Sequence, residues 1–233
     1  MSGEKEVTNG LNESLSYLKG ISTASISDVL DMLGVNGGCG GILPVQPGAS
    51  CLGPAYTVKF ESVVPGAAAP AADYVDDVPS GSVIVLDNSG RVDCTVWGDI
   101  LTIVAERRGL SGTVIHGCCR DAAAIRGMAH PVFSVSRFMK SGKNRVRMVA
   151  RQVPVQIGGT LVRPGDFVRA DDSGVICVPH ELLARTVELV RELEEMEQKV
   201  RAEITSGSPL REARSKHGYN RFSLNPSAQR QRA

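Results

Sequence analysis

The sequence predicts an α/β fold, and three features predict it. Residues 82–87 form a continuous apolar run between turn signals, which is typical of a strand covered on both faces. Residues 95–108 have the apolar spacing of an amphipathic helix, and the short run 113–116 predicts the next strand. A turn and a helix over 121–128 follow. Strand, helix, strand, turn, helix is the βαβ order of an α/β domain.

The first half of the chain alternates helix and strand signals. The elements expected before the helix at 95–108 are a short helix at 11–19, a capped amphipathic helix at 23–34 that Gly34 ends, a strand at 54–61, one short helix within the Ala/Pro-rich stretch 65–79, the strand at 82–87 and a loop at 88–91. In the helix at 95–108, the residues expected to face the core are Ile100, Leu101, Ile103, Val104 and Ala105.

After Pro131 the pattern changes to strands and then to one long helix. Strands are expected at 132–135, 146–155, 160–162, 167–170 and 175–178. A helix from His180 to about residue 206 follows, with an apolar stripe of Leu182, Leu189, Leu193, Met196, Val200 and Ile204. We expect a single α/β domain over 1–206 and a basic C-terminal tail over 207–233, mobile or in contact with another subunit.

The overall charge excludes some classes of partner. The 26 Lys and Arg residues nearly balance the 25 Asp and Glu residues, for a net charge of +1. A chain so balanced has no general attraction to nucleic acid or to membranes, so neither is an expected partner. There is no apolar run long enough to span a bilayer, and the first ten residues carry no apolar signal core, so we expect a cytoplasmic protein.

The six cysteines and the glycine-rich segment indicate no redox motif or nucleotide site. The cysteines form no C-x-x-C pair, and the neighbours Cys118 and Cys119 are expected to be small buried residues rather than a reactive pair. The glycines of 37–41 follow a predicted helix, not a strand, and Leu43 stands where a dinucleotide loop needs its third glycine. A nucleotide-type cofactor is therefore not expected.

Asp99 is the first candidate for chemistry. It follows Gly98 in the first turn of the predicted helix, where free N–H groups and the helix dipole favour an anion. Such a helix start can bind a substrate carboxylate, and a glycine lets the ligand approach the backbone. An aspartate at a helix start is also a common cap with no further role.

The adjacent Arg120 and Asp121 form the second candidate. They follow the strand at 113–116 and stand at the start of the next helix. A guanidinium is a planar fork for a carboxylate, and a carboxylate can hold a hard cation directly or through water. The βαβ crossovers bring both helix starts to one end of the sheet, where α/β sites usually lie. A helix-capping Asp121 beside a surface Arg120 is the alternative.

The spacing of these residues resembles a known family. Twenty residues separate Asp99 from Arg120, and Asp121 follows at once. This pattern is similar to the signature of class II pyruvate aldolases that cleave 4-hydroxy-4-methyl-2-oxoglutarate, in the RraA-like family named after a regulator of ribonuclease activity. The resemblance covers nearly the whole chain and includes, in order, TASISDVLD at 23–31, Gly98-Asp99, Arg120-Asp121, PVQIGG at 154–159, PGD at 164–166 and ADDSGV at 170–175.

The resemblance implies a fold and a site. The fold would be an α-β-β-α sandwich of the swivelling-domain type, assembled as a homotrimer or a homohexamer with sites between subunits. Asp121 would hold Mg²⁺ or Mn²⁺, and Arg120 would bind the substrate's carboxylate and carbonyl region. Asp99 would order water around the metal, and the backbone of Gly98, Ile100 and Leu101 would hold the carboxylate. Glu197 is the best match to a glutamate that a neighbouring subunit supplies, although it is equally a solvated helix residue.

The implied reaction is a metal-dependent carbon–carbon lyase reaction on a small 2-keto acid. Cleavage of a 4-hydroxy-2-oxo acid would release pyruvate, and the same enolate chemistry would decarboxylate oxaloacetate. No lysine is needed for a Schiff base, and neither Lys59 nor Lys140 has a supporting pattern. His116 is a departure, because many aldolases of the family have Asp there. It is either an acid or base near the site or a strand residue with a satisfied hydrogen bond.

Two alternatives stay open. Relatives that regulate a ribonuclease bind a protein partner and catalyse nothing, and they tend to lose the acid that follows the arginine. This chain keeps both Arg120 and Asp121. The second alternative is a lyase for another 2-keto or β-keto acid in a specialised pathway.

Overall fold

The structure, a computed structural model, describes residues 13–64 and 66–222. The chain divides into two compact units, Gly37–His180 and the combination of Met1–Asn36 with Glu181–Ala233. The expected division into a domain at 1–206 and a tail at 207–233 stays a prediction. Within the tail segment, residues 207–222 contain two short helices, and residues 223–233 lie outside the described part.

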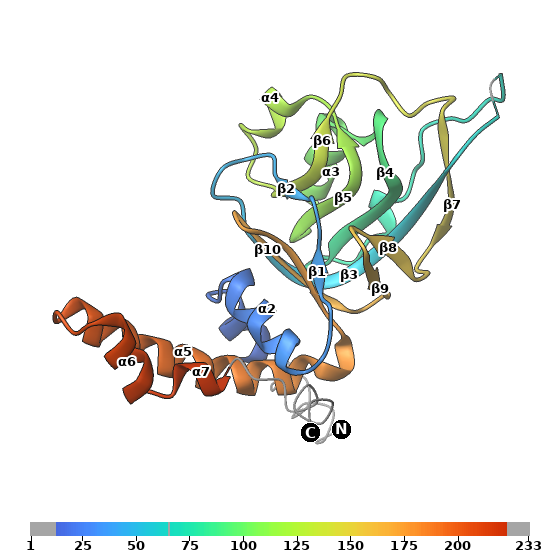
Figure 1. Ribbon diagram of the computed structural model, residues 1–233. Coiled ribbons are helices and arrows are strands. Elements are labelled where there is room, and N and C mark those ends of the chain that lie inside the picture. The colour runs from blue at the N-terminus through green and yellow to red at the C-terminus, as the bar shows by residue number, and fades with distance from the viewer. Residues whose placement is uncertain (1–12, 65, 223–233) are drawn as a thin grey trace. The chain divides into compact units, whose positions relative to one another are not determined.

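A mixed sheet is the centre of the unit Gly37–His180 (Figure 1). Its strands are β1 (Gly38–Cys39), β2 (Leu43–Pro44), β3 (Cys51–Ser62), β4 (Val83–Trp97), β5 (Gly112–Cys119), β6 (Val132–Arg137), β7 (Val146–Arg151), β10 (Phe167–Asp171) and β11 (Gly174–Val178). They are paired in the order β1-β11-β10-β3-β4-β5-β6-β2, with β7 also on β3. A separate hairpin pairs β8 (Val155–Ile157) with β9 (Thr160–Val162).

The middle of this sheet is parallel and buried on both faces. Strands β3, β4, β5 and β6 pair in parallel, and antiparallel strands flank them. Along β4, Ile84 and Leu86 belong to one apolar cluster and Val83 and Val85 to the other. None of these four side chains is more than 1% exposed. The apolar run at 82–87 therefore forms a strand that is buried on both faces, as predicted.

Two short helices connect the parallel strands and position the site. Helix α3 (Asp99–Arg107) follows β4, and α4 (Ala122–Ile125) follows β5. Because the carboxyl ends of parallel strands meet at one edge of a sheet, the starts of α3 and α4 lie at the same edge. The predicted strand-helix-strand-turn-helix order is confirmed.

Strand β4 differs from its expected form. It continues through residues 88–91, where a loop was expected, and α3 begins at Asp99 rather than near residue 95. Register shifts against β5 absorb the extra residues, and Ser89 and Gly90 have positive φ values of 54° and 67°. Such bulges extend a strand through residues that would otherwise form a loop, and sequence periodicity does not reveal them.

The expected core face of α3 is also partly wrong. Ile100 and Ile103 are 67% and 47% exposed, while Thr102 and Ala105 are buried. Helix α3 begins one residue after β4 ends and buries only a narrow stripe of its surface. The apolar residues on the opposite side of the helix are therefore exposed.

Smaller differences have local causes. Where a helix was expected in 65–79, the described residues contain only the 3₁₀ turn η1 (Val75–Asp77). The expected strand at 146–155 is divided into β7 and β8 around Gln152, which has a φ of 53°, and Pro154, which has no N–H to donate to a ladder.

The other unit is helical. Residues 13–18 are helical, as expected for 11–19, of which 11 and 12 lie outside the described part. The remaining helices are α2 (Thr23–Met32), α5 (Leu183–Thr205), which follows the 3₁₀ turn η2 (His180–Leu182), α6 (Leu210–Lys216) and α7 (Tyr219–Phe222). Ser22 caps α2, Gly34 follows it with a φ of 72°, and Ser25 Oγ donates to Glu194 of α5 at 2.7 Å. The predicted bounds of α2 and α5 are confirmed to within a few residues.

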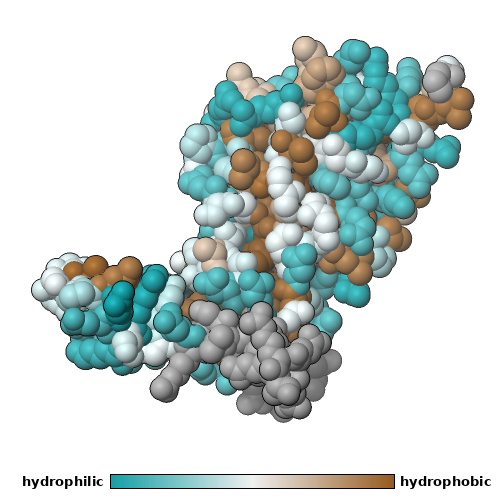
Figure 2. All heavy atoms as spheres, in the orientation of Figure 1, coloured by the Kyte–Doolittle hydropathy of each residue, from teal (hydrophilic) through white to brown (hydrophobic). Residues whose placement is uncertain are grey.

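The α/β class expected from the sequence is confirmed by this central sheet and its helices. Figure 2 shows that apolar surface occurs in separate patches among polar residues on the face in view. Among the described residues, no helix is both long and apolar enough to cross a bilayer.

Candidate functional site

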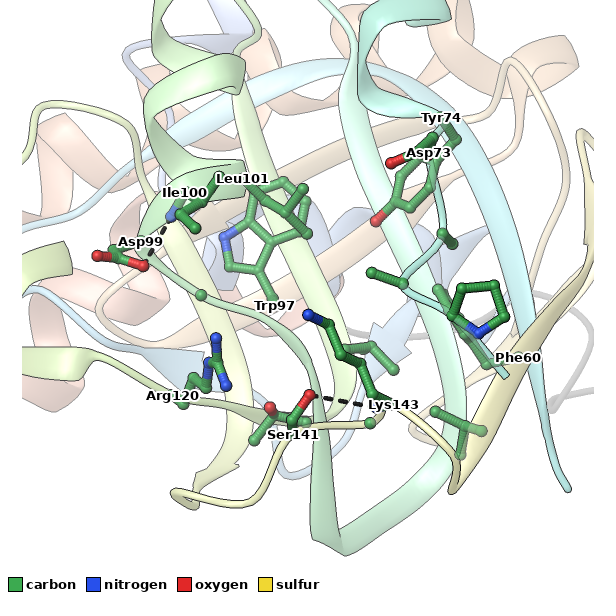
Figure 3. A pocket seen from close by; sticks show the side chains of 18 residues that line it. Phe60, Asp73, Tyr74, Trp97, Asp99, Ile100, Leu101, Arg120, Ser141 and Lys143 are labelled. Carbon is green, nitrogen blue, oxygen red and sulfur yellow. Dashed lines mark hydrogen bonds between the residues drawn. The ribbon is translucent and has the colours of Figure 1, made fainter. Parts of the chain in front are cut away.

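A pocket of about 240 Å³ lies where β4 ends and α3 begins (Figure 3). One side is formed by the end of β4, the first turn of α3 and Arg120. The opposite side is formed by Phe60 and residues 70–74, and a third by the loop at 141–143. The pocket is therefore charged at one end and mainly apolar at the other.

The start of α3 is fixed by a chain of buried hydrogen bonds. Trp97, 2% exposed, donates from Nε1 to Thr102 Oγ1 at 2.9 Å. The Thr102 hydroxyl donates in turn to the Gly98 carbonyl at 2.9 Å. Trp97 also stacks on His130, with ring centroids 6.3 Å apart. The backbone at Gly98 is therefore held in place by the buried side chains of Trp97 and Thr102.

Asp121 and Arg120 lie so close to Gly98 that a side chain at this position would displace them. A Cβ at this position would be 2.6 Å from Asp121 Oδ2 and 3.3 Å from both Cγ and Nε of Arg120. Its backbone is extended, with φ −159° and ψ −169°, so the requirement is close approach and not backbone conformation. Gly98 is the N-cap of α3, and its missing side chain lets the arginine and the aspartate of the next crossover reach this helix start.

Asp121 does not act as the helix cap that was its alternative role. It occupies the N-cap position of α4 in the left-handed conformation, with φ 56° and ψ 33°, and its side chain makes no cap bond. Instead Oδ2 accepts from the backbone N–H of Asp99 at 3.4 Å and lies 3.2 Å from Arg120 Nε. A non-glycine residue in this conformation is uncommon and often marks a functional position.

The neighbouring groups complete the charged end of the pocket. Asp99 is in the first turn of α3, as predicted, and its Oδ1 accepts from the Ile100 N–H at 2.8 Å. The side chain of Arg120 is 38% exposed, and its guanidinium extends into the pocket in Figure 3. The backbone N–H of Arg120 donates to the Trp97 carbonyl at 3.0 Å, and this bond connects the ends of β4 and β5.

The structure brings most of the predicted site residues together. Gly98, Asp99, Ile100, Leu101 and Arg120 line the pocket. Asp121 is outside the lining and contacts Gly98, Asp99 and Arg120. The sequence did not single out the other lining residues, among them Trp97, Tyr74 and Lys143. An isolated aromatic residue or a lysine in a loop carries no spacing signal, so only the fold reveals them.

Comparison with known proteins gives the family. The model of the family described as "RraA-like: Aldolase/RraA" matches residues 23–177. The chain belongs to the RraA-like family. The protein DlpA of Legionella pneumophila is 42% identical over 207 residues, which are 88% of this chain and 34% of DlpA. The chain thus spans about a third of that relative's length, and 59% of the length of a Methanocaldococcus jannaschii relative.

Relatives whose length is closer to that of this chain have names of two kinds. A Burkholderia multivorans protein named "Putative 4-hydroxy-4-methyl-2-oxoglutarate aldolase" is 35% identical over 134 residues, 57% of this chain and 78% of its own. RraAS2 of Streptomyces coelicolor is titled an unusual member of the RNase ES inhibitor RraA protein family. Its structure has a TM-score of 0.71 and 28% identity, covering 81% of this chain and 96% of its own.

The fold class predicted from the sequence is confirmed by solved structures. Besides RraAS2, the crystal structure of an uncharacterized protein from Pseudomonas syringae pv. tomato superposes with a TM-score of 0.81 at 45% identity. The matched region covers 87% of this chain and 97% of that one. The family therefore includes both named aldolases and a named inhibitor lineage, and membership alone does not decide between them.

The donor set fits a hard cation that keeps much of its water. Among the described residues, no group of three or more His, Cys, Asp or Glu side chains could enclose a metal. The Asp121 carboxylate faces the Asp99 amide in a cradle that a Cβ on Gly98 would fill. One or two carboxylates with retained water is how Mg²⁺ is usually bound, whereas zinc and other closed sites need more protein ligands.

Glu197 is in the helical unit, on α5. Its side chain is 20% exposed and accepts from Arg201 Nη1 at 2.8 Å. Its role as a residue from a neighbouring subunit stays a prediction.

His116 is a strand residue with a satisfied hydrogen bond. It lies on β5 opposite Asp87 of β4, outside the pocket lining. Its Nδ1 is 3.0 Å from the Gln156 carbonyl and 3.6 Å from Asp87 Oδ1. The structure therefore favours the second of the two roles expected for it.

Cys118 and Cys119 are buried, as expected. Both side chains are 0% exposed, and burial raises the pKa of each thiol. A protonated, inaccessible thiol is a poor nucleophile, so the prediction of small buried residues is confirmed.

Proposed function

We propose that this chain is a divalent-metal-dependent lyase that cleaves a 4-hydroxy-2-oxo acid, such as 4-hydroxy-4-methyl-2-oxoglutarate, to pyruvate and also decarboxylates oxaloacetate. One observation carries the proposal. Arg120 and Asp121 are brought against the first turn of α3 at Gly98, where any Cβ would force the Asp121 carboxylate to move. The family's named aldolases support the reaction class.

The residues of the pocket divide the work of binding. Arg120 supplies a fixed positive charge and a planar fork for the carboxylate and carbonyl oxygens of the 2-oxo acid. The first amides of α3, those of Ile100 and Leu101, would hold the carboxylate. The Ile100 N–H donates to Asp99 Oδ1, and on substrate binding Asp99 would exchange this bond for one to water. Asp121, held beside Asp99, would hold Mg²⁺ or Mn²⁺, which when bound polarises the 2-oxo group.

The bond that breaks is C3–C4 of the substrate. A water ordered by Asp99 takes the proton of the C4 hydroxyl, and C4 becomes a carbonyl carbon. The electron pair of the broken bond passes to C3 and the C2 oxygen as an enolate. Arg120 stabilises the negative charge that develops on that oxygen. A proton returned to C3 gives pyruvate. With oxaloacetate the same C3–C4 bond breaks, carbon dioxide leaves, and the same enolate forms.

A second candidate function is regulation of a ribonuclease through protein contact, because RraAS2 bears that family name. The presence of Asp121 favours the enzyme. Its left-handed backbone is strained and its carboxylate makes no capping hydrogen bond, so neither feature has an evident purpose in α4 itself.

The test is pyruvate release from 4-hydroxy-4-methyl-2-oxoglutarate and, separately, from oxaloacetate. We expect release with Mg²⁺ or Mn²⁺, none with chelator, and a loss of at least about 100-fold in Asp121→Ala. Asp76→Asn is the matched control, because Asp76 is an exposed carboxylate of the same unit outside the pocket lining. Absence of release from both compounds by folded protein with either metal would overturn the proposal.

A further inference from the structure

Gly98 and Asp99 share one peptide group, and this group connects the buried interior to the charged end of the pocket. Its carbonyl belongs to Gly98 and its N–H to Asp99. Because a peptide group is planar, whatever fixes the direction of the carbonyl also fixes the direction of the N–H. On the pocket side, the Asp99 N–H donates to Asp121 Oδ2 at 3.4 Å. On the interior side, the Gly98 carbonyl accepts two hydrogen bonds, both from Thr102.

The two bonds come from different parts of Thr102. Its backbone N–H donates at 3.1 Å, which is an ordinary bond of the first turn of α3. Its hydroxyl donates at 2.9 Å, and the same oxygen accepts from Trp97 Nε1 at 2.9 Å. The indole N–H thus occupies the oxygen as an acceptor and leaves the hydroxyl proton for the Gly98 carbonyl. Thr102 is 0% exposed, so water does not compete for these bonds.

Gly98 needs such support because it is a glycine. The torsion ψ of Gly98 rotates the shared peptide group, and a residue without a Cβ restricts this rotation least. The hydrogen bonds from Thr102 therefore hold a torsion that the residue itself leaves free. Hydrogen bonds in series also polarise one another, so the two bonds to the carbonyl make the Asp99 N–H a stronger donor.

The Asp121 carboxylate is the group that this support orients. Its Oδ2 accepts from the Asp99 N–H and lies 3.2 Å from Arg120 Nε. Within residues 13–64 and 66–222, no group donates a hydrogen bond to Oδ1, and the carboxylate makes no cap bond to α4. The orientation of the carboxylate is therefore set at Oδ2, and it decides where Oδ1 is presented to a cation.

We propose that Thr102 is a positioning residue for the cation site, and that its hydroxyl acts on Asp121 through the Gly98–Asp99 peptide group. This inference rests on the proposed function, in which Asp121 holds Mg²⁺ or Mn²⁺. A threonine hydroxyl that bonds the carbonyl four residues earlier is common in helices and has no role by itself. Here the same hydroxyl also accepts the indole bond, and the carbonyl belongs to the peptide group that contacts Asp121.

The test measures the binding of Mn²⁺ alone, without substrate, from the electron paramagnetic resonance signal of the free ion. Thr102→Val removes the hydroxyl and keeps a branched side chain, and Thr102→Ser keeps the hydroxyl. Thr113→Val is the matched control. Thr113 is also 0% exposed, and its hydroxyl is 2.9 Å from Nε2 of His130, the ring that stacks on Trp97. This control removes a buried hydroxyl from the same packed region but not from the shared peptide group.

A second pair of variants covers the case in which Thr102→Val does not fold. Valine at this position leaves the indole N–H of Trp97 buried without a partner, which is destabilising. The double variant Trp97→Phe, Thr102→Val removes both partners, so no buried donor is left unsatisfied. It is compared with Trp97→Phe alone, in which the Thr102 hydroxyl still donates to the Gly98 carbonyl.

We expect the dissociation constant for Mn²⁺ to rise about tenfold in Thr102→Val, the usual effect of losing a group that orients a metal ligand. Thr102→Ser should restore most of the affinity. The double variant should bind Mn²⁺ more weakly than Trp97→Phe by the same factor. Thr113→Val should bind it as the wild type does, although its melting temperature falls.

The outcomes separate this inference from the lyase proposal. Wild-type affinity in Thr102→Val and in the double variant, or an equal loss in Thr113→Val, would overturn the inference and leave metal-dependent pyruvate release standing. The expected changes in Mn²⁺ binding without pyruvate release would overturn the lyase alone. A folded wild-type chain that binds no Mn²⁺ would overturn both.

Discussion

At Gly98 the two crossovers of the sheet are in direct contact. Asp121 approaches it because Asp121 itself is in the left-handed conformation, which turns its carboxylate away from α4 and toward α3. The predicted βαβ order placed Asp99, Arg120 and Asp121 at one end of the sheet, because parallel strands end at one edge. It could not predict the conformation of Asp121, since no pattern of residue types encodes a single positive φ at an aspartate.

Substitution of Gly98 tests this arrangement at the residue scale. In Gly98→Ala the new methyl group would meet Asp121 Oδ2 at 2.6 Å, so the carboxylate and Arg120 must move. Because the backbone there is extended, we expect a change in melting temperature of only a few degrees but a loss of at least about 100-fold in kcat/KM for pyruvate release. Thermal unfolding and steady-state kinetics measure the two effects.

Gly127→Ala is the matched control for Gly98→Ala. A Cβ at Gly127 would meet its nearest neighbour, the Ala124 carbonyl oxygen, at 3.4 Å, which is an ordinary contact. Its activity should be that of the wild type. Full activity in Gly98→Ala would show that the close approach of Asp121 is not needed for turnover.

At the scale of elements, the site depends on how α3 is packed on β4 and β5. Periodicity predicted a helix here, but its start and its buried face are set by particular contacts: the bulges that lengthen β4 and the Trp97–Thr102 hydrogen bond. Behind them lies His130, 2% exposed, whose Nε2 is 2.9 Å from Thr113 Oγ1 of β5. The Glu106 carboxylate of α3 accepts a hydrogen bond from the backbone N–H of His130 at 3.3 Å. These tertiary contacts override local propensity and are not visible in the sequence.

His130 should make the packing of these elements sensitive to acid. Burial lowers the pKa of its imidazole from 6.5 to about 4, so the unfolded chain binds a proton more readily than the folded one between these values. Its contribution to stability is complete above about pH 6.5 and is lost as the pH falls toward 4, by up to about 3 kcal/mol. Urea unfolding from pH 4.5 to 7.5 measures this slope.

The variant His130→Gln removes the titrating group while keeping a side chain that can bond Thr113. We expect it to be less stable at pH 7.5 and to lose less stability than the wild type between pH 6.5 and 4.5. Equal slopes in the two proteins would show that His130 is already solvated in the folded state or that other groups dominate the acid response.

For the whole molecule, the sequence predicted the α/β class, the family and the edge of the sheet at which Asp99, Arg120 and Asp121 meet. It predicted these correctly because they follow from the order of elements and from motif spacing. It said less about Lys143 and Tyr74, which reach the pocket from segments that are distant in sequence and carry no motif. Glu197 is a separate case, because its expected role concerns a neighbouring subunit and follows from the family resemblance alone.

That role leads to a test with mixed subunits. If Glu197 completes the site of a neighbour, then Arg120→Ala and Glu197→Ala should each be inactive alone and regain activity when unfolded, mixed and refolded together. In random oligomers, about a quarter of the sites would pair an intact Arg120 with an intact Glu197 from the next subunit, so about a quarter of wild-type activity should return.

The control mixture combines Arg120→Ala with Asp121→Ala. Both changes affect the same subunit's side of the site, and no arrangement of these chains restores it, so no activity should return. Native mass spectrometry of each mixture reports whether hetero-oligomers formed. Hetero-oligomers without recovery in the first mixture would place Glu197 outside the shared site, and a chain that remains monomeric while active would remove the need for a second subunit altogether.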